Sequence, residues 1–162
     1  MTTWEHAIKL VLDYEGRVFE DDPKDLGGET KYGISKKAYP LLDIRSLTEE
    51  EAKAIYRRDY WDPLMADELP AKLAVVAFDC AVNQGTGRAI RLLQSLLGVE
   101  ADGKIGPKTI EAAKASDDNL VWMYLLHRAK LYMSTKTVEH WGANWGLRLV
   151  KLAQELFYGG DK

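Results

Sequence analysis

The chain has 162 residues, a formal net charge of −3, and 46% hydrophobic and 29% charged side chains. A chain of that length can bury the core of one domain. The slight negative charge argues against a dedicated nucleic-acid binder. The chain contains no stretch of about 20 apolar residues, so no membrane span is predicted. The only cysteine, Cys80, excludes an internal disulfide, and its apolar flanks predict a buried core residue. The three histidines lack the spacing of a zinc site, so we expect no metal and no cofactor.

An amphipathic helix is predicted first. Thr2 followed by Glu5 forms the pattern of a capping box, and Gly16 provides a C-terminal stop. The helical period is then lost over residues 17–34, where short strands, RVF and ETKYGI, are expected around a glycine-rich turn. Ser35 is expected to begin one further short helix.

The rest of the chain has helical periodicity almost throughout. A second capping box, Thr48 with Glu51, predicts the helix that follows it, and the nearly apolar stretch 70–85 predicts a central buried helix. The sequence WGANWG, residues 141–146, is expected to interrupt the last helices. Further helices are expected at residues 86–98, 107–115, 117–134 and 147–157. We therefore predict a mainly α single domain, residues 1–162, with a small β-like insertion near its N-terminus.

Glu15 is the first candidate catalytic residue. It lies four residues after Val11 and seven after Ile8, so on a helix all three share the core-facing side. At the helix end, partial burial and the negative end of the helix dipole both favour the protonated carboxyl. A general acid that works near neutral pH requires that form. A solvated side chain at a fraying helix end is the alternative.

A second group of acidic side chains follows within ten residues. Asp21, Asp22 and Asp25 lie on a glycine-rich turn, which can aim one carboxylate back at the helix end, and Thr30 follows with a hydroxyl that can hold a water. An acid, a second carboxylate and a held water are the parts of an inverting glycosidase, whose carboxyl groups stand about 6.5–9.5 Å apart. Calcium binding is the alternative, but the spacing does not follow the EF-hand loop.

The stretch EGR…DDPKDLGGETKYGIS, within residues 13–35, resembles the signature of glycoside hydrolase family 108, the N-acetylmuramidases of bacteria and phages. The matching positions are Glu15, Gly16, Asp22, Pro23, Gly27, Gly28, Thr30, Gly33 and Ile34. Arg17 departs from the signature, which has a second glycine there. It places a cation beside the acid, either to favour the charged carboxylate or to bind an anionic part of the substrate.

A second stretch also resembles this family. AVNQGTGRAIRLLQSLLGVEADGKIGPKTIEA is similar to the region labelled in the family as a predicted peptidoglycan-binding domain, and here it covers about residues 80–115. We interpret it as part of a helical lobe, residues 71–162, of the same fold as a catalytic lobe, residues 1–70. DGKIGPKT within it is also typical of a turn followed by a proline-led helix start.

The resemblance implies a lysozyme-like helical fold and cleavage of the β-1,4 bond between N-acetylmuramic acid and N-acetylglucosamine in bacterial peptidoglycan. It implies Glu15 as the catalytic acid. By similarity to the Asp…Thr pairing of other lysozyme-like hydrolases, Asp25 with Thr30 is preferred for positioning water, and Asp22 is the alternative second carboxylate. The favoured biological role is that of a phage endolysin.

Substrate contacts are expected from amides and aromatic rings. Asn83 and Gln84, at the end of the central helix, can hydrogen-bond N-acetyl groups, or they cap that helix. Tyr32, within the signature, is the preferred stacking surface for a sugar, and Tyr60 and Trp61 are further candidates. Aromatic rings in such positions more often belong to the core.

Two other functions are open from the sequence. A non-catalytic peptidoglycan-binding or secretion-accessory protein would keep the fold without cutting, and a lytic transglycosylase would use one glutamate and release an anhydro sugar. The combination of Glu15 with a second acid and Thr30 favours hydrolysis, because a water must be held. Since the sequence shows no secretory signal, we expect a monomer made in the host cytoplasm, without stable membrane association, that reaches the wall through a holin pore.

Overall fold

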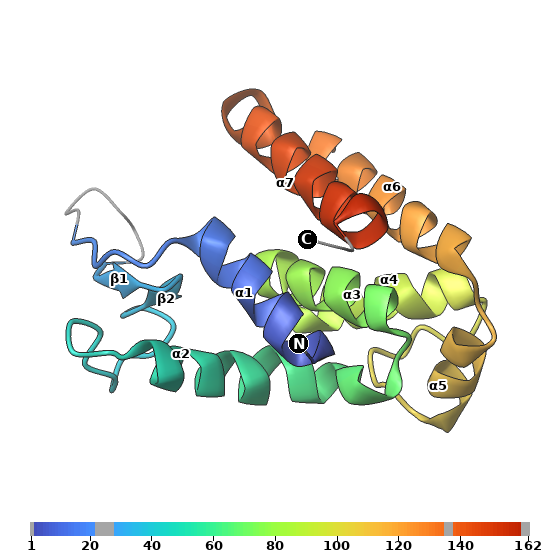
Figure 1. Cartoon of the computed structure of the whole chain (residues 1–162), viewed down its shortest axis with the longest axis horizontal. Coiled ribbons are helices and arrows are strands. Elements are labelled where there is room, and N and C mark those ends of the chain that lie inside the picture. Colours follow the sequence, from blue (N-terminus) through green and yellow to red (C-terminus); the bar gives the residue numbers. More distant parts are fainter. Residues whose placement is uncertain (1, 22–27, 135–137, 160–162) are drawn as a thin grey trace. The chain divides into compact units, whose positions relative to one another are not determined.

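The computed structural model describes residues 2–21, 28–134 and 138–159, with only the backbone at 138–141. The chain forms two compact units, a first unit of residues 1–59 and a second unit of residues 60–162 (Figure 1). The second unit is built mainly from helices, and the first combines two α-helices with turns and loops. The described residues contain one small sheet, so the mainly α fold with a β-like insertion that we predict for the chain is confirmed.

Two capped helices frame the first unit. Helix α1, Thr3–Glu15, begins with the predicted capping box, in which Thr2 N–H donates to Glu5 Oε2 over 2.7 Å and Glu5 N–H donates to Thr2 Oγ1 over 3.2 Å. Helix α2, Glu49–Tyr56, begins with the same motif at Thr48. Local hydrogen bonds therefore set where both helices start, as the sequence predicts.

The sheet of the first unit is a two-residue hairpin. Strand β1, Thr30–Lys31, pairs antiparallel with β2, Ile34–Ser35, with Lys31 opposite Ile34. The strand expected at RVF does not form. Instead, Glu20 makes an isolated antiparallel bridge to Thr30, with backbone hydrogen bonds of 2.8 and 2.9 Å. The insertion is therefore organised around β1, which pairs with a neighbour on each side.

The short helix expected after Ser35 is a single turn. The N–H groups of Ala38 and Tyr39 both donate to the Ser35 carbonyl, at 3.1 and 3.0 Å, but no helical run follows. Pro40 explains the stop, because proline disfavours the helical conformation of the residue before it. The helix prediction is wrong here, although its predicted starting residue does begin the turn.

The second unit is a helical bundle around α3, Ala71–Gln84. This helix is buried on nearly every side from Leu73 to Ala81, which confirms the predicted central helix. It packs against α4 and α6, and α6 pairs with α7. The bounds of the remaining helices are Thr86–Leu97 for α4, Pro107–Lys114 for α5, Asp118–Met133 for α6 and Val138–Tyr158 for α7.

Helix α7 runs without a break through WGANWG, residues 141–146, so the predicted interruption is wrong. Each glycine in a helix costs about 1 kcal/mol relative to alanine, which weakens a helix without necessarily ending it. Tertiary packing offsets that cost here. The Trp145 ring stacks on Tyr132 of α6 with centroids 4.8 Å apart, which holds this part of α7 against its neighbour.

One buried glutamine organises the loop between α4 and α5. Gln94 is 1% exposed, and its Nε2 donates to Asp102 Oδ1 at 2.8 Å and to the Lys104 carbonyl at 2.9 Å. Its Oε1 accepts the Gly103 N–H at 2.9 Å. A buried amide satisfied on both ends fixes the loop to α4. The motif DGKIGPKT thus makes a turn and a proline-led helix start, as its second interpretation predicts.

Candidate active site

Glu15 is the last residue of α1, and its side chain is half-buried. The helix ends there because Gly16 adopts φ +84°, a conformation that favours glycine, while its N–H donates to the Leu12 carbonyl at 3.1 Å. The carboxyl therefore occupies the C-terminal end of a helix whose preceding turn, Leu10 to Leu12, is buried. This placement is the one that the helical period predicts.

The hairpin turn that follows in the signature is formed by Tyr32 and Gly33. Both have positive φ, +53° and +75°, as a type I′ turn requires of a two-residue hairpin. The Tyr56 side chain, 2% exposed on α2, holds this turn by donating its hydroxyl to the Tyr32 carbonyl over 2.8 Å. The signature hairpin is thus fixed to the helix that follows it.

Gly33 brings this turn into contact with Glu15. A Cβ added at Gly33 would lie 2.8 Å from Glu15 Cβ, 3.0 Å from Glu15 Cγ and 2.6 Å from the Tyr56 hydroxyl. No real Cβ tolerates such distances, so only glycine allows the approach. The structure therefore places the predicted acid directly against the predicted hairpin, and Gly33 is the residue that permits it.

We expect Gly33→Ala to lower the free energy of unfolding of the first unit by about 2–5 kcal/mol. About 1–2 kcal/mol comes from a Cβ at positive φ, and about 1–3 kcal/mol from its overlap with Glu15 and Tyr56. Urea unfolding followed by circular dichroism measures the change. The matched control is Gly98→Ala, where φ is +69° and nothing lies within 4 Å. Equal losses in the two variants would show that the contact with Glu15 has no cost of its own.

Thr30 lies at the start of β1, half-buried. Its hydroxyl donates to the Gly28 carbonyl over 3.1 Å, which fixes the orientation of Oγ1 and leaves that oxygen able to accept a hydrogen bond from water. Asp22 and Asp25, the two candidates for the second carboxylate, lie outside the described residues. Their roles therefore stay predictions, as does the water-positioning role of Thr30.

Arg17 does not act as an unpaired cation. Its guanidinium pairs with Asp13 Oδ1 at 3.0 Å and with Glu49 Oε2 at 2.5 Å, which ties the end of α1 to the start of α2. Its side chain is 45% exposed, so these pairs contribute little to stability. The charge of the residue that departs from the family signature is thus compensated by two neighbouring carboxylates.

Asn83 and Gln84 lie at the end of α3 in the second unit, both half-buried. Asn83 Oδ1 accepts the Tyr132 hydroxyl at 2.5 Å, and Gln84 Oε1 accepts the Cys80 thiol at 3.2 Å. Both amides therefore use their oxygens in contacts within the protein. Their NH₂ groups are the part that a substrate acetyl oxygen would use, and that role stays a prediction.

Cys80 is fully buried, as predicted for a core residue. Burial raises the pKa of its thiol, so the side chain is a poor nucleophile near neutral pH.

Trp61 is not available to a sugar. Its side chain is 0% exposed, its ring packs edge-on against Phe78 with centroids 5.3 Å apart, and its Nε1 donates to Asp67 Oδ1 over 3.0 Å. The prediction of a stacking surface at Trp61 is therefore wrong, because the ring belongs to the core. Tyr32 and Tyr60 are both half-buried, so each keeps some exposed surface, and their substrate contacts stay predictions.

The second unit also contains a buried charge cluster that sequence reasoning missed. Asp79 on α3 pairs with Arg128 Nη1 of α6 at 2.8 Å, and it accepts hydrogen bonds from Arg148 Nε and Nη2 of α7 at 3.0 and 2.8 Å. Arg128 Nη2 also donates to the Tyr132 hydroxyl at 3.1 Å, which continues the network to Asn83. The sequence signal for this cluster is Asp79 itself, a charged residue within the nearly apolar stretch that forms α3.

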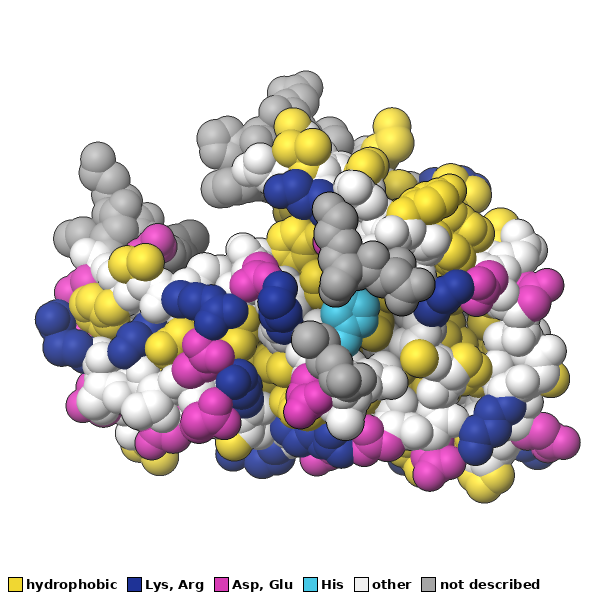
Figure 2. All heavy atoms as spheres, viewed as in Figure 1, with side chains coloured by type: hydrophobic (Ala, Val, Ile, Leu, Met, Phe, Trp, Pro, Cys, Tyr) yellow, Lys and Arg dark blue, Asp and Glu magenta, His cyan; other side chains and the backbone are white. Residues whose placement is uncertain are grey.

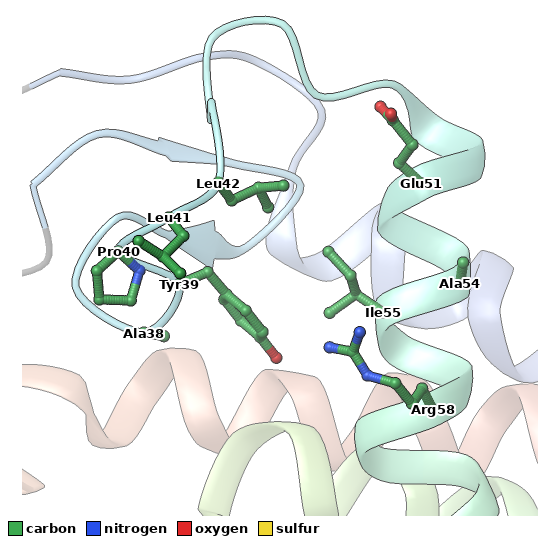
Figure 3. Close-up of a pocket in the computed structure, with 9 residues that line it drawn as sticks. All are labelled: Ala38, Tyr39, Pro40, Leu41, Leu42, Glu51, Ala54, Ile55 and Arg58. Atoms are coloured by element: carbon green, nitrogen blue, oxygen red, sulfur yellow. The ribbon is translucent and has the colours of Figure 1, made fainter.

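A separate hollow of about 540 Å³ lies in the first unit between the loop 38–42 and α2. Figure 3 shows Tyr39, Leu42 and Ile55 facing this space, with Arg58 at its lower end. The Tyr39 hydroxyl donates to Asp59 Oδ2 at 2.8 Å. Of the predicted catalytic residues that the structure describes, neither Glu15 nor Thr30 lines the hollow.

Acidic and basic side chains are interspersed on the face of the protein that Figure 2 shows. Within the described ranges, no three histidine, cysteine, aspartate or glutamate side chains are grouped to hold a metal ion. Nor does that part of the chain contain a helix long and apolar enough to cross a membrane.

Comparison with known proteins gives two family matches in order along the chain. Residues 8–85 match the model described as glycosyl hydrolase 108, and residues 88–159 match the model described as a predicted peptidoglycan domain. The second match begins at residue 88, after the start of the predicted stretch 80–115, and extends beyond that stretch to residue 159. A search among curated proteins finds no match.

Among solved structures, the chain is similar to SagA of Brucella abortus. The two share 29% sequence identity and superpose with a TM-score of 0.85, over 99% of this chain and 97% of that chain. The likeness therefore extends over both units, and the lysozyme-like class predicted from the sequence is confirmed.

Proposed function

The chain belongs to glycosyl hydrolase family 108, with a predicted peptidoglycan domain after the hydrolase region, and from this we propose that it is an N-acetylmuramidase. The coarser function, a glycoside hydrolase that acts on peptidoglycan, follows from the two family matches. The bond we propose is the β-1,4 bond between N-acetylmuramic acid and N-acetylglucosamine. The contact between the signature hairpin and the Glu15 side chain at Gly33 is the observation that supports this most.

In the proposed reaction, the Glu15 carboxyl donates its proton to the glycosidic oxygen as the bond to the muramic acid C1 breaks. The water attacks C1 from the opposite face of the sugar and loses a proton to a carboxylate. We assign that carboxylate to Asp25, with Asp22 as the alternative. The products are one new reducing N-acetylmuramic acid end and one N-acetylglucosamine hydroxyl, so one water is consumed for each bond cut.

Thr30 is proposed to hold the attacking water. Its hydroxyl hydrogen is engaged by the Gly28 carbonyl, so its oxygen can accept a hydrogen bond from the water. In this proposal the other water proton goes to the base. The bridge between Glu20 and Thr30 fixes the backbone at this position, which favours a defined geometry for the water.

Mass analysis of the products tests the reaction. We expect purified peptidoglycan digested by the protein to yield hydrated muropeptides with a reducing N-acetylmuramic acid end. Fragments one water lighter would identify a lytic transglycosylase instead. The absence of any fragments, with the protein bound to the wall, would favour the non-catalytic binding function.

A role as a phage endolysin completes the proposal. This role rests on the family resemblance. In it, the protein is a monomer without stable membrane association, and it reaches the cell wall through a holin pore.

A further inference from the structure

A polar pocket of about 470 Å³ opens on the second unit, where α3 ends and α4 begins. Its lining residues are Gln84, Arg88, Arg91, Leu92 and Ser95. The last four share one face of α4, because residues three and four apart are neighbours on a helix. The pocket thus has two guanidinium groups, an amide and a hydroxyl around one hollow, and its described lining contains no aromatic ring.

The two arginines of this pocket have no carboxylate partner among the residues that the structure describes. Within the described part of the chain, neither Arg88 nor Arg91 has an acidic oxygen within 4.0 Å, whereas Arg58, Arg128 and Arg148 each pair with an aspartate. Helix stability does not explain Arg88 either. It lies in the first turn of α4, which contains no acid, and a cation there opposes the helix dipole.

The Arg91 guanidinium is held in place by the backbone around it. Its Nη1 donates to the Gly87 carbonyl at 3.2 Å. A Cβ added at Gly87 would lie 3.1 Å from Nη1, and one added at Gly103 would lie 2.9 Å from Cζ. Two glycines therefore leave room for this one group. Gly103 is in turn fixed by the buried Gln94, so the position of the guanidinium is built into the fold.

The Gln84 amide is a further donor that suits an anionic ligand. Its oxygen is occupied by the Cys80 thiol, which leaves its NH₂ donors for a ligand. Ser95 adds no donor, because its hydroxyl hydrogen is donated to the Arg91 carbonyl at 2.8 Å. Guanidinium groups match carboxylates and phosphates in geometry and charge, and they form stronger hydrogen bonds than neutral donors do. The ligand class that suits this pocket is therefore an oxyanion, and the stem peptides of peptidoglycan supply it as carboxylates.

We propose that this pocket binds a carboxylate of the peptidoglycan stem peptide. This inference rests on the proposed function only because that function identifies peptidoglycan as the polymer. The residues proposed to cut the glycan strand are different from those that line this pocket. Stem peptides are the carboxylate-rich part of peptidoglycan, whereas the sugar backbone would be recognised by stacking rings, which are absent from the described lining of this pocket. The second unit would thereby distinguish peptide-substituted strands from bare glycan.

A binding experiment with the full chain tests this. The protein carries Glu15→Gln so that the wall stays intact, and it is sedimented with intact peptidoglycan or with chitin, a β-1,4 N-acetylglucosamine polymer that carries neither peptides nor carboxylates. We expect Arg88→Gln/Arg91→Gln to weaken binding to intact peptidoglycan about tenfold, as for the loss of two exposed charge pairs, and to leave binding to chitin unchanged. Free L-alanyl-D-glutamate should compete for intact peptidoglycan.

The matched control is Lys104→Gln/Lys108→Gln, which removes the same charge from exposed positions of the same unit. An equal weakening by the control pair would show general attraction of charges, and inorganic phosphate competing as well as the dipeptide would show a general anion site; either outcome overturns the proposal. The proposal is also overturned if the arginine variant binds intact peptidoglycan as tightly as the unsubstituted protein and its thermal unfolding is unchanged. The proposed function fails separately, if the wild-type protein releases no hydrated muropeptides.

Discussion

Peptidoglycan cleavage is expected to fall by about 10²–10⁴-fold when Glu15 is replaced by glutamine, the range attributed to a single general acid. An amide of nearly the same shape fills the space against Gly33, so the packing of the hairpin turn is kept. It has no acidic proton to give to the glycosidic oxygen, so the loss should appear in kcat while KM changes little. The initial rate at which reducing ends form from purified peptidoglycan measures the effect.

Glu20→Gln is the matched control for that variant. Glu20 is an exposed acid in the same segment, and its described hydrogen bonds to Thr30 are made by its backbone alone. We expect its rate to stay within about twofold of wild type, as for a surface change that leaves the fold intact. A Glu15→Gln protein that cuts at the wild-type rate would remove Glu15 from the reaction. Equal losses in both variants would point to the charge of the segment instead.

The features that the sequence predicts well are those decided by neighbours along the chain. The capping boxes at Thr2 and Thr48 need only residues three positions apart, and both are present. The position of Glu15 follows from the same kind of information, because a helical period fixes which face a residue shares with Ile8 and Val11. Local hydrogen bonds and side-chain periodicity do not depend on the rest of the fold.

The errors arise where a distant partner decides the outcome. Trp61 is removed from solvent by Phe78, seventeen residues away, and burial of that kind leaves no trace in the local pattern. WGANWG stays helical because Trp145 stacks on Tyr132. The contact of Gly33 with Glu15 was equally hidden, since the signature marks a glycine without showing what approaches it. Glycine and tryptophan are residues whose role depends on the surface that they meet.

Asp79 is the strongest case of a role set by distant partners, and it leads to the largest expected loss of stability. Asp79→Asn should lower the free energy of unfolding of the second unit by about 3–5 kcal/mol, because removing one partner of a buried ion pair leaves the other charge uncompensated. Arg128 is 0% exposed and Asp79 is 2% exposed, so water cannot replace the lost carboxylate. Urea unfolding at pH 7 measures the loss.

The control for this change is Asp118→Asn, which removes an ion pair with Lys72 in the same unit but at the surface. Its loss should stay below about 1 kcal/mol. A similar loss in both variants would mean that burial adds nothing to the Asp79 cluster.

The pH dependence gives a second test of the same cluster. Burial alone would raise the pKa of the Asp79 carboxyl, but the charges of Arg128 and Arg148 outweigh it and hold that pKa below its usual range. The unfolded chain, with a carboxyl pKa of about 3.9, therefore takes up this proton more readily than the folded protein does. The stabilisation that the Asp79 charge provides is complete above the pKa of the unfolded chain, and it is lost as the pH falls through the lower pKa of the folded state.

Since asparagine does not titrate and resembles a protonated aspartate, the difference in unfolding free energy between wild type and Asp79→Asn should shrink as the pH falls below about 4. A difference that stays constant from pH 7 to pH 3 would show that the variant loses packing rather than charge.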